Sequence, residues 1–274
     1  MKPILKWAGG KSSLIQDIKM FLPKDIEKRK YHEPFFGGGA LFFDLEPKKG
    51  TINDVNEKLI NFYKIVKEQP ESLILEASAY QKYATDVEKY YELREEFNDS
   101  NLSDLKSAAL FLYFNKTAYN GLYRVNSQNK FNVPIGKYKK PNIVNKKRIR
   151  EASKILKNIE ILCEDFIYIE KKSSEGDFCY FDPPYYQSSP NKFTDYSKKG
   201  FTLQDHKKLR DLCVSLNEKG VYFVLSNSNT PEIKDMYLEK NFDIKIIDSK
   251  WMISCNALSR GQIKEILVHN LNYF

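Results

Sequence analysis

The fold is decided by the stretch Phe178-Cys179-Tyr180-Phe181-Asp182-Pro183-Pro184-Tyr185, in which four apolar residues end at a carboxylate and two prolines. The apolar run predicts a buried strand, and the prolines make a stiff turn because each ring fixes φ near about −65° and removes an N–H. The carbonyls of Asp182 and Pro183 are therefore expected to stay free as hydrogen-bond acceptors. Open α/β sheets bind ligands at the carboxyl ends of their strands. A planar amine could bind there, with the carboxylate and the fixed carbonyl as hydrogen-bond acceptors and the Tyr185 ring against its face. The simpler alternative is a proline turn in which Tyr185 packs as an ordinary aromatic residue.

The N-terminal third of the chain has the pattern of an α/β unit. A strand is expected at 31–35, a glycine turn at 37–39 and a helix at 40–45. A short second strand at 51–53 leads into an amphipathic helix at 56–67. The order strand, turn, helix, strand is typical of a parallel sheet covered by helices.

The alternation then stops for about 80 to 90 residues. Residues 70–120 have a helical pattern throughout, and 123–133 alternate around Asn126-Ser127-Gln128-Asn129 in the manner of a hairpin. We therefore predict a mostly helical domain at 67–149, inserted into a catalytic α/β domain formed by 1–66 and 150–274.

The α/β pattern resumes after the insertion, and Thr202 and Gly220 are expected to begin and end one of its helices. The complete prediction is an α/β fold with a seven-stranded, Rossmann-like sheet. Beyond the strand at 178–181, the remaining strands are expected at 159–163, 221–226, 242–249 and 263–269, and the remaining helices at 203–217 and 231–239.

Composition excludes several classes of protein. The 274 residues are 42% hydrophobic and 14% aromatic, which is ample for a globular core. No window approaches the roughly 20 apolar residues of a membrane span, and the start lacks the apolar segment of a signal peptide, so a cytoplasmic protein with no membrane partner is expected. The four cysteines and three histidines form no metal-ligand spacing, and no metal is expected.

Positive charge is concentrated in one segment. The whole chain carries +8, but residues 101–150 hold eleven Lys and Arg against one acid, Asp104, a net charge of +10. Aromatic residues such as Tyr123 and Phe131 are interleaved with these cations. Such a run is usually a solvated face, but cations mixed with rings also suit a polyanion with bases that can stack, and we expect nucleic acid.

The glycine turn favours a nucleoside cofactor. Glycine allows backbone to approach a ligand closely, and Asp54, just past the second strand, is placed to accept the hydroxyls of a ribose. A plain tight turn, and a helix N-cap role for Asp54, are the alternatives. Gly9-Gly10-Lys11-Ser12 is no phosphate loop, because Leu5 stands where the leading glycine belongs. A cofactor without pyrophosphate fits better, and S-adenosylmethionine is the usual one.

Four motifs in this order resemble the Dam-type (alpha-group) DNA adenine-N6 methyltransferases, over nearly the whole chain. They are Leu5-Lys6-Trp7-Ala8-Gly9-Gly10-Lys11, Pro34-Phe35-Phe36-Gly37-Gly38-Gly39-Ala40, Asn53-Asp54-Val55-Asn56 and Asp182-Pro183-Pro184-Tyr185. Residues 115–124 and 131–138 resemble the target-recognition region of the members that read GATC in double-stranded DNA.

The resemblance implies a role for each matching residue. Asp182, Pro183 and Tyr185 would be catalytic, and Tyr119 and Asn120 would fill the gap left by a flipped base while Arg124 reads a guanine. Cofactor-binding residues would be Trp7, Lys11, Phe35, Gly37, Gly39, Asp54, Asp165, Phe166 and Asp182. Of these, Asp165 and Phe166 would flank the adenine of the cofactor. The DNA-recognition residues would be Lys6, Tyr119, Asn120, Leu122, Arg124, Pro134 and Tyr138.

The target is expected to be an exocyclic amine. Methylation at carbon 5 of cytosine needs a cysteine nucleophile, typically beside a proline, and none of the four cysteines has one. An aspartate before Pro-Pro-Tyr favours adenine N6, and the base must leave the duplex to be reached. Residues 187–200 are expected to form a long loop that could order over the flipped base, and a flexible surface loop is the alternative. The alternative functions are methylation of an amine in another DNA sequence such as GATATC, methylation of cytosine N4, and DNA binding by a catalytically silent protein. A monomer suffices, and a partner restriction endonuclease is left open.

Overall fold

The computed structural model describes residues 1–99, 101–186, 200–250 and 262–271. The loop predicted at 187–200 therefore lies outside the described residues, except for Gly200. The chain divides into two units that interleave along the sequence. One unit consists of Met1–Gly10, Gly37–Glu46 and Asp54–Cys163, and the second of Lys11–Phe36, Pro47–Asn53 and Glu164–Phe274. The boundaries expected from the sequence, with an insertion at 67–149, stay a prediction.

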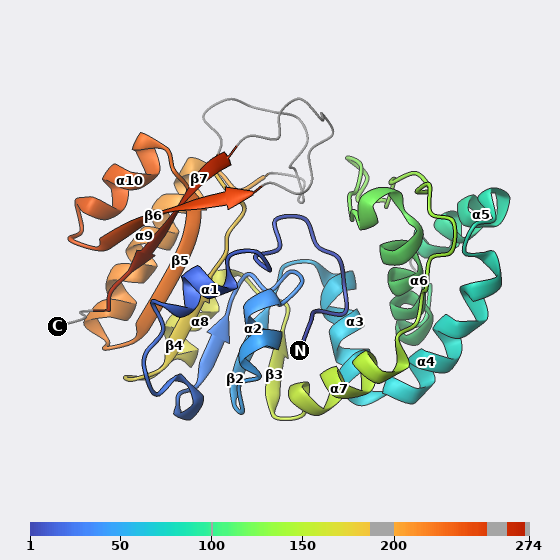
Figure 1. Cartoon of the computed structure of the whole chain (residues 1–274), viewed down its shortest axis with the longest axis horizontal. Helices are drawn as coiled ribbons and strands as arrows, with labels where there is room; N and C mark the ends of the chain where they lie inside the picture. Colours follow the sequence, from blue (N-terminus) through green and yellow to red (C-terminus); the bar gives the residue numbers. More distant parts are fainter. Residues whose placement is uncertain (100, 187–199, 251–261, 272–274) are drawn as a thin grey trace. The chain divides into compact units, whose positions relative to one another are not determined.

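The sheet has the seven strands expected from the sequence, which confirms the predicted fold class (Figure 1). Their order is β3-β2-β1-β4-β5-β7-β6. Parallel pairing joins β1 to β2 and β4, and β4 to β5, while β7 runs antiparallel to β5 and β6. The strands are β1 Tyr31–Glu33, β2 Gly50–Asn53, β3 Ile159–Leu162, β4 Phe178–Phe181, β5 Tyr222–Ser228, β6 Asp243–Lys250 and β7 Gln262–His269.

The centre of the sheet explains why Phe178–Phe181 reads as a continuous apolar run. All four residues of β4 are buried, as expected of a strand covered on both faces. Strand order reverses between β1 and β4, because the chain runs from β1 to β2 on one side and returns to β4 on the other. In open α/β sheets the ligand crevice lies at the carboxyl ends of the strands at such a switch point.

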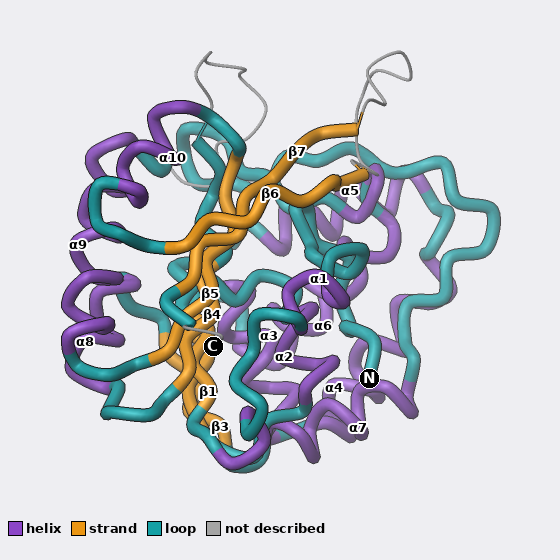
Figure 2. The backbone as a smooth tube through the Cα atoms, turned by 60° about the vertical axis from the view of Figure 1, so that its left-hand side comes forward, coloured by secondary structure: helices purple, strands orange, loops and turns teal. Residues whose placement is uncertain are grey.

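Helices α8, α9 and α10 lie on one side of the sheet (Figure 2). They are Ile169–Lys172, Leu203–Glu218 and Pro231–Leu238, and the short α1, Ile15–Lys19, belongs to the same unit. The predicted start of α9 is confirmed by a capping box between Thr202 and Asp205. Its end is confirmed as well, since Gly220 follows the C-cap with a φ of 74°.

The other unit is mostly helical, and α6, Asp104–Thr117, forms its centre. Ten of its fourteen residues are buried, and α3, α4 and α5 pack against it. The helical pattern at 70–120 is thereby confirmed. The other helices of this unit are α2 Ala40–Leu45, α3 Glu57–Glu68, α4 Pro70–Ala79, α5 Val87–Phe97 and α7 Lys146–Leu156. Short 3₁₀ helices occur in both units. In this unit they are η2 Tyr80–Tyr83 and η3 Tyr119–Gly121, and in the other unit η1 Ile26–Lys28 and η4 Phe166–Tyr168.

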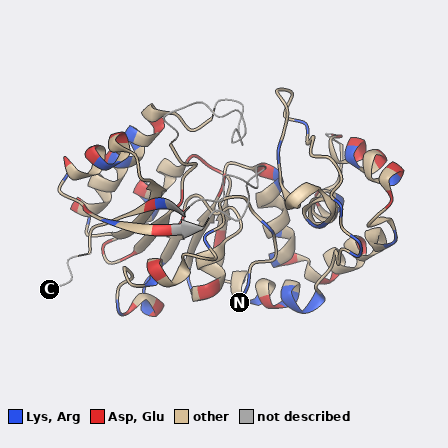
Figure 3. Ribbon diagram, turned by 45° about the horizontal axis from the view of Figure 1, so that its top comes forward, with Lys and Arg blue, Asp and Glu red and all other residues tan. Residues whose placement is uncertain are grey.

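Two features of this unit differ from expectation. The hairpin at 123–133 is reduced to an isolated bridge between Val125 and Phe131, and a second bridge joins Ala118 to Ile135. Helix α7 was not expected, because its lysines and arginines resemble a solvated charge run. In Figure 3 the ribbon of α7 is coloured mostly as Lys and Arg, and that of α5 carries both the basic and the acidic colour.

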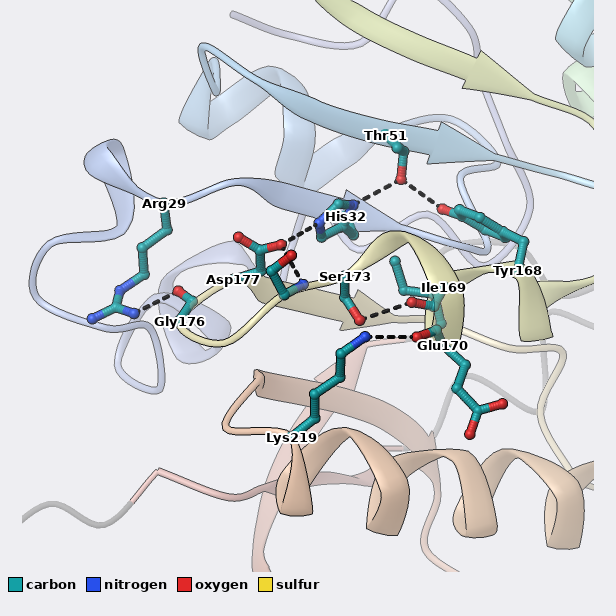
Figure 4. A network of polar contacts seen from close by, with 11 residues as sticks. Arg29, His32, Thr51, Tyr168, Ile169, Glu170, Ser173, Gly176, Asp177 and Lys219 are labelled. Atoms are coloured by element: carbon teal, nitrogen blue, oxygen red, sulfur yellow. Dashed lines mark hydrogen bonds and ion pairs between the residues drawn. The ribbon is translucent and has the colours of Figure 1, made fainter.

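A buried polar network ties the strands together away from the glycine turn (Figure 4). His32 in β1 bonds Thr51 Oγ1 in β2 at 2.9 Å and Asp177 Oδ2, just before β4, at 3.2 Å. Thr51 Oγ1 also lies 2.7 Å from the Tyr168 hydroxyl. Burial alone raises the pKa of Asp177, but the bonds from His32 and the Ser174 N–H outweigh it and hold that pKa below its usual value. The network stabilises the sheet centre through satisfied buried polar groups.

Candidate functional site

The glycine turn after β1 is held by Asp54. One oxygen of its carboxylate accepts the Gly37 N–H at 2.9 Å, and the other accepts the Asn56 N–H at 3.0 Å. Gly37 and Gly39 have φ values of 48° and 64°, which favour glycine. The N-cap of α3 is Asn56, so the alternative of Asp54 in that position is wrong. Burial raises the pKa of Asp54 despite these hydrogen bonds, which indicates a carboxylate short of neutralising partners.

Trp7 packs directly on this turn. A Cβ added to Gly37 would lie 2.7 Å from Trp7 Cδ1 and Nε1, so only glycine leaves room for the indole. The indole also stacks on Tyr123, with ring centroids 6.2 Å apart at 18°, and on Phe111 at 6.4 Å and 27°. Trp7, Gly37, Gly39 and Asp54 are therefore all residues of the first unit, where Trp7 and Asp54 both contact Gly37.

Asp182 follows β4 in the other unit and forms an ion pair with Lys11. Lys11 Nζ lies 3.0 Å from Asp182 Oδ1, and the same ammonium lies 4.4 Å from the centroid of the Tyr185 ring. Lys11 is buried, whereas the Asp182 side chain keeps 20% of its surface exposed. Burial raises the pKa of Asp182 to about 6, although the charge of Lys11 and its hydrogen bond oppose the rise. A carboxyl group tuned in this way, next to a ring and with Pro183 buried beside it, can both accept hydrogen bonds and take up a proton.

The phenol of Tyr185 is held by a residue that sequence reasoning missed. Its hydroxyl donates to Glu265 Oε2 at 2.5 Å, and Glu265 lies in β7. Burial raises the pKa of Tyr185 well above its usual value, helped by the charges of Asp182 and Glu265, so the phenol keeps its proton and acts as donor. No local signal marks Glu265, because a carboxylate in a strand normally indicates the solvated face.

Aromatic side chains line the same edge of this unit. Phe35, after β1, lies 5.3 Å from the ring of Phe166 and 5.6 Å from that of Phe201, and it is half-buried. Asp165 is exposed and accepts the Ile167 N–H at 3.0 Å, which makes it the cap of η4. Lys11, Phe35, Asp165, Phe166 and Asp182 are therefore all residues of the second unit.

A fully buried amide, that of Asn53, holds the strand ends in register. Its Nδ2 donates to the carbonyls of Pro34 and Glu164 at 3.0 and 2.9 Å, and its Oδ1 accepts the Glu164 N–H at 2.8 Å. The chain segments that follow β1 and β3 are thereby fixed to the end of β2. This amide was not singled out in the sequence beyond its place in a motif.

The predicted DNA-recognition residues gather in the first unit. The Tyr119 N–H donates to the Pro134 carbonyl at 2.9 Å, and Asn120 follows in the left-handed region with a φ of 54°. Tyr119 is 42% exposed and Asn120 is exposed, which leaves both accessible to a partner. Leu122, half-buried, closes this turn through its N–H to the Tyr119 carbonyl at 3.1 Å.

Two cations complete this group. Lys6 Nζ donates to the Tyr138 hydroxyl at 3.3 Å and lies 4.5 Å from the centroid of that ring. Arg124 is exposed, and its Nε donates to Asn132 Oδ1 at 2.9 Å, which fixes the orientation of the guanidinium. Its Nη2 also donates to the Asn132 carbonyl at 3.5 Å, and the other terminal N–H groups are the donors that a ligand could use.

Comparison with known proteins identifies the family. The model of the D12 class N6 adenine-specific DNA methyltransferases matches residues 7–254. The chain belongs to this family. It is an adenine-specific DNA methyltransferase.

The relatives cover nearly the whole chain. It is 42% identical to the Type II methyltransferase M1.LlaDCHI of Lactococcus lactis subsp. cremoris, over 98% of this chain and 95% of that protein. It is 40% identical to the Type II methyltransferase M.MjaIII of Methanocaldococcus jannaschii, over 98% and 99%, and 34% identical to the DNA adenine methylase of Escherichia coli K12, over 97% and 94%. Among solved structures, a precorrin 8W decarboxylase aligns with a TM-score of 0.38 and 10% identity over 95% of this chain and 90% of that one, too weak a likeness for any argument.

Two further observations concern the described ranges alone. None of their helices has the length and apolar composition that crossing a membrane requires. Within the same ranges, His, Cys, Asp and Glu side chains form no cluster of three or more that could hold a metal ion.

Proposed function

We propose that this methyltransferase transfers a methyl group from S-adenosylmethionine to N6 of an adenine that is flipped out of duplex DNA, and that its target is GATC. The observation that carries the proposal is the set of Asp182, Lys11 and Tyr185 at the switch point of the sheet. The Lys11 ammonium lies 3.0 Å from the Asp182 carboxylate and 4.4 Å from the centroid of the Tyr185 ring, so one cation contacts both the carboxylate and the aromatic ring.

The residues of the glycine turn fit the proposed cofactor. Gly37 and Gly38 are buried against Trp7, leaving backbone rather than side chains at the surface of the turn, and Asp54 has lone pairs beyond those used by its two backbone bonds. Val55 beside it exposes 67% of its surface, as suits an apolar contact for a nucleobase. When bound, S-adenosylmethionine supplies an electrophilic methyl group on a sulfonium. Asp54 would hold the ribose, and Trp7, Lys11, Phe35, Gly37, Gly39, Asp165, Phe166 and Asp182 would line its pocket.

The mechanism places the amine between two acceptors. The Asp182 carboxylate and the Pro183 carbonyl accept the two N6–H groups, which draws the nitrogen lone pair out of conjugation with the ring, while Tyr185 stacks on the base. Transfer of the methyl group to N6, with the neutral thioether as leaving group, would leave a positive charge on N6, which would then give up one proton. Asp182, with a pKa of about 6, accepts this proton and releases it to water. Lys11 keeps Asp182 ionised before the base enters.

The DNA face is proposed to lie on the +10 segment. Tyr119 and Asn120 would fill the space left in the duplex, and Arg124 would read a guanine bidentately in the major groove. Lys6, Leu122, Pro134 and Tyr138 would contact neighbouring bases, and residues 67–149 would form the recognition domain. The GATC assignment is supported by these residue types in their resemblance to the GATC readers.

The cellular context is a separate part of the proposal. Two of the relatives are named Type II methyltransferases, so a partner restriction endonuclease is proposed alongside the target sequence. A monomer contains every residue in the proposed mechanism, and no second copy is invoked.

The test is incubation of the purified enzyme and S-adenosylmethionine with unmethylated genomic DNA, followed by single-molecule sequencing of modified bases. We expect N6-methyladenine in every GATC. Methylation of adenine in another sequence overturns the target, and N4-methylcytosine overturns the base.

The matched control is Asp182→Ala. It should lose methyl transfer while binding duplex DNA with nearly unchanged affinity in a gel-shift assay. Near-normal transfer by this variant would remove Asp182 from the mechanism. Absence of transfer by the wild-type protein, with DNA binding intact, would favour the silent binding protein.

A further inference from the structure

Glu265 is a buried carboxylate that the proposed mechanism does not use. It is 4% exposed, and its position in β7 opposite Ser228 of β5 places it inside the second unit. Within the described residues it forms no ion pair with a lysine or arginine, and its hydrogen-bond partner is the Tyr185 hydroxyl at 2.5 Å. A carboxylate is costly to bury without a partner, so this single bond carries unusual weight.

The bond extends a chain of contacts that reaches the reacting group. Glu265 accepts from the Tyr185 phenol, the Tyr185 ring lies under the Lys11 ammonium at 4.4 Å, and Lys11 pairs with Asp182 at 3.0 Å. The next residue along, Tyr186, is tied to the sheet through its N–H to Asn227 Oδ1 at 3.4 Å. The ring is thus fixed by its backbone at one end and by Glu265 at the other.

We propose that Glu265 is a positioning residue for methyl transfer, which fixes the Tyr185 ring in the plane where it stacks on the flipped base. This inference rests on the proposed function. Proline fixes the backbone before Tyr185, but it leaves the side-chain torsions of the tyrosine free to rotate. The phenol–carboxylate bond removes that freedom. Because the Tyr185 ring is then already ordered, binding of the flipped base costs no side-chain conformational entropy at this residue.

The charge of Glu265 gives the proposal a second readout. The ionisable groups facing Asp182 are Lys11 from the N-terminal segment, Tyr180 from β4, Tyr185 from the following turn and Glu265 from β7. Burial is the main cause of the raised pKa of Asp182, Lys11 lowers it, and the negative charge of Glu265 raises it further. Replacing Glu265 by glutamine keeps an oxygen that accepts the phenol proton but removes this charge.

The test measures single-turnover methylation of a duplex by Tyr185→Phe, Glu265→Ala, Glu265→Gln and the double variant Tyr185→Phe/Glu265→Ala. We expect each of the first two to slow transfer about tenfold, and the double variant to be no slower than the worse of the two, because both remove the same bond. Glu265→Gln should retain most of the rate and shift the acid limb of the pH profile to lower pH. Cofactor affinity, measured by calorimetry, should stay within about twofold of the wild type.

A matched control is available in the same unit. The Tyr31 phenol donates to Glu33 at 2.7 Å and is buried, but Tyr31 begins β1, whereas Asp182 and Tyr185 lie beyond the carboxyl end of β4. Tyr31→Phe should therefore lower stability without slowing transfer. Melting curves of all variants identify any that fail to fold, and the conservative Tyr185→Phe and Glu265→Gln then decide the question.

Three results would overturn the positioning role. These are a wild-type rate in Tyr185→Phe, slowing in the double variant equal to the product of the single effects, and an unshifted pH profile in Glu265→Gln. Failure of the proposed function looks different, since the wild-type protein itself would then leave adenine unmethylated. In that case the coupling of Tyr185 to Glu265 would still be measured by the same double-mutant cycle in urea unfolding.

Discussion

Replacing Gly37 by alanine tests how the glycine turn packs against Trp7. Two costs add at this position. Residue 37 has a φ of 48°, which costs an L-residue about 1 to 2 kcal/mol. The new Cβ would also lie 2.7 Å from two atoms of the Trp7 indole, and relieving such overpacking costs about 1 to 3 kcal/mol. We expect the free energy of unfolding to fall by about 2 to 5 kcal/mol in total.

A matched variant separates the two costs. Gly9 has a φ of 73°, and a Cβ added there meets no atom within 4 Å. Gly9→Ala should therefore lose only the conformational part, about 1 to 2 kcal/mol. The assay is urea unfolding followed by circular dichroism for both variants, with calorimetry of S-adenosylmethionine binding. Gly37→Ala should weaken that binding about tenfold or more, because either the turn or Trp7 must move.

The reasoning fails if the two alanine variants lose the same stability, since the contact with Trp7 would then contribute nothing. A second check is the double variant Trp7→Ala/Gly37→Ala. Removal of the indole makes room for the new methyl group, so the added cost of Gly37→Ala should shrink to that of Gly9→Ala. An unchanged cost in the Trp7→Ala background would place the clash elsewhere.

Further predictions concern pH, the buried network and base reading. Methyl transfer should decline as pH falls through about 6, because the Asp182 carboxyl becomes protonated and loses its acceptor role; a constant rate in that range contradicts the assignment. Asp177→Asn should lower the free energy of unfolding by about 1 to 3 kcal/mol at neutral pH. Since the folded pKa of Asp177 is held below the usual 3.8, its contribution is complete above 3.8 and is lost as pH falls through the lower folded value, so urea unfolding in acid should show a smaller difference. Arg124→Ala should cost about 1 to 3 kcal/mol of discrimination at one guanine, measured by competition binding with substituted duplexes; unchanged preference would exclude Arg124 as a reader.

Helices and strands that are bounded by glycine or proline could be predicted closely from the sequence. The strand at 178–181 and the helix at 40–45 have the predicted bounds, because Asp-Pro-Pro ends one and the glycines begin the other. The first strand is shorter than expected, since the Phe36 N–H bonds the Asn53 carbonyl and the backbone has already entered the turn. Local signals therefore locate elements well where backbone chemistry forces a boundary.

Other elements were obscured by side-chain chemistry. In the predicted hairpin, Asn126 Oδ1 accepts the N–H groups of Gln128 and Lys130 and so replaces ladder bonds. Helix α7 was hidden by its cations, although Asn145 caps it and Ile149, Ala152 and Leu156 repeat at helical spacing. A charge run thus masked an amphipathic helix.

The site itself was only partly readable. The motifs located Asp182, Asp54 and the glycines, but Lys11 as the ion-pair partner of Asp182 depends on the fold. Glu265 lies 80 residues beyond Tyr185, and its contact depends on the antiparallel register of the last strand. Such register is set by tertiary pairing, which no local pattern encodes.

The place of β7 in the sheet bears on how the protein folds. This strand lies between β5 and β6 although it follows both in the chain. Before it inserts, the facing edges of β5 and β6 are unpaired, and open strand edges invite aggregation and proteolysis. The same insertion delivers Glu265 to Tyr185. Insertion of β7 therefore completes the sheet and brings Glu265 to Tyr185 in the same step, so a chain without it is vulnerable to degradation and also lacks the contact that we propose positions Tyr185.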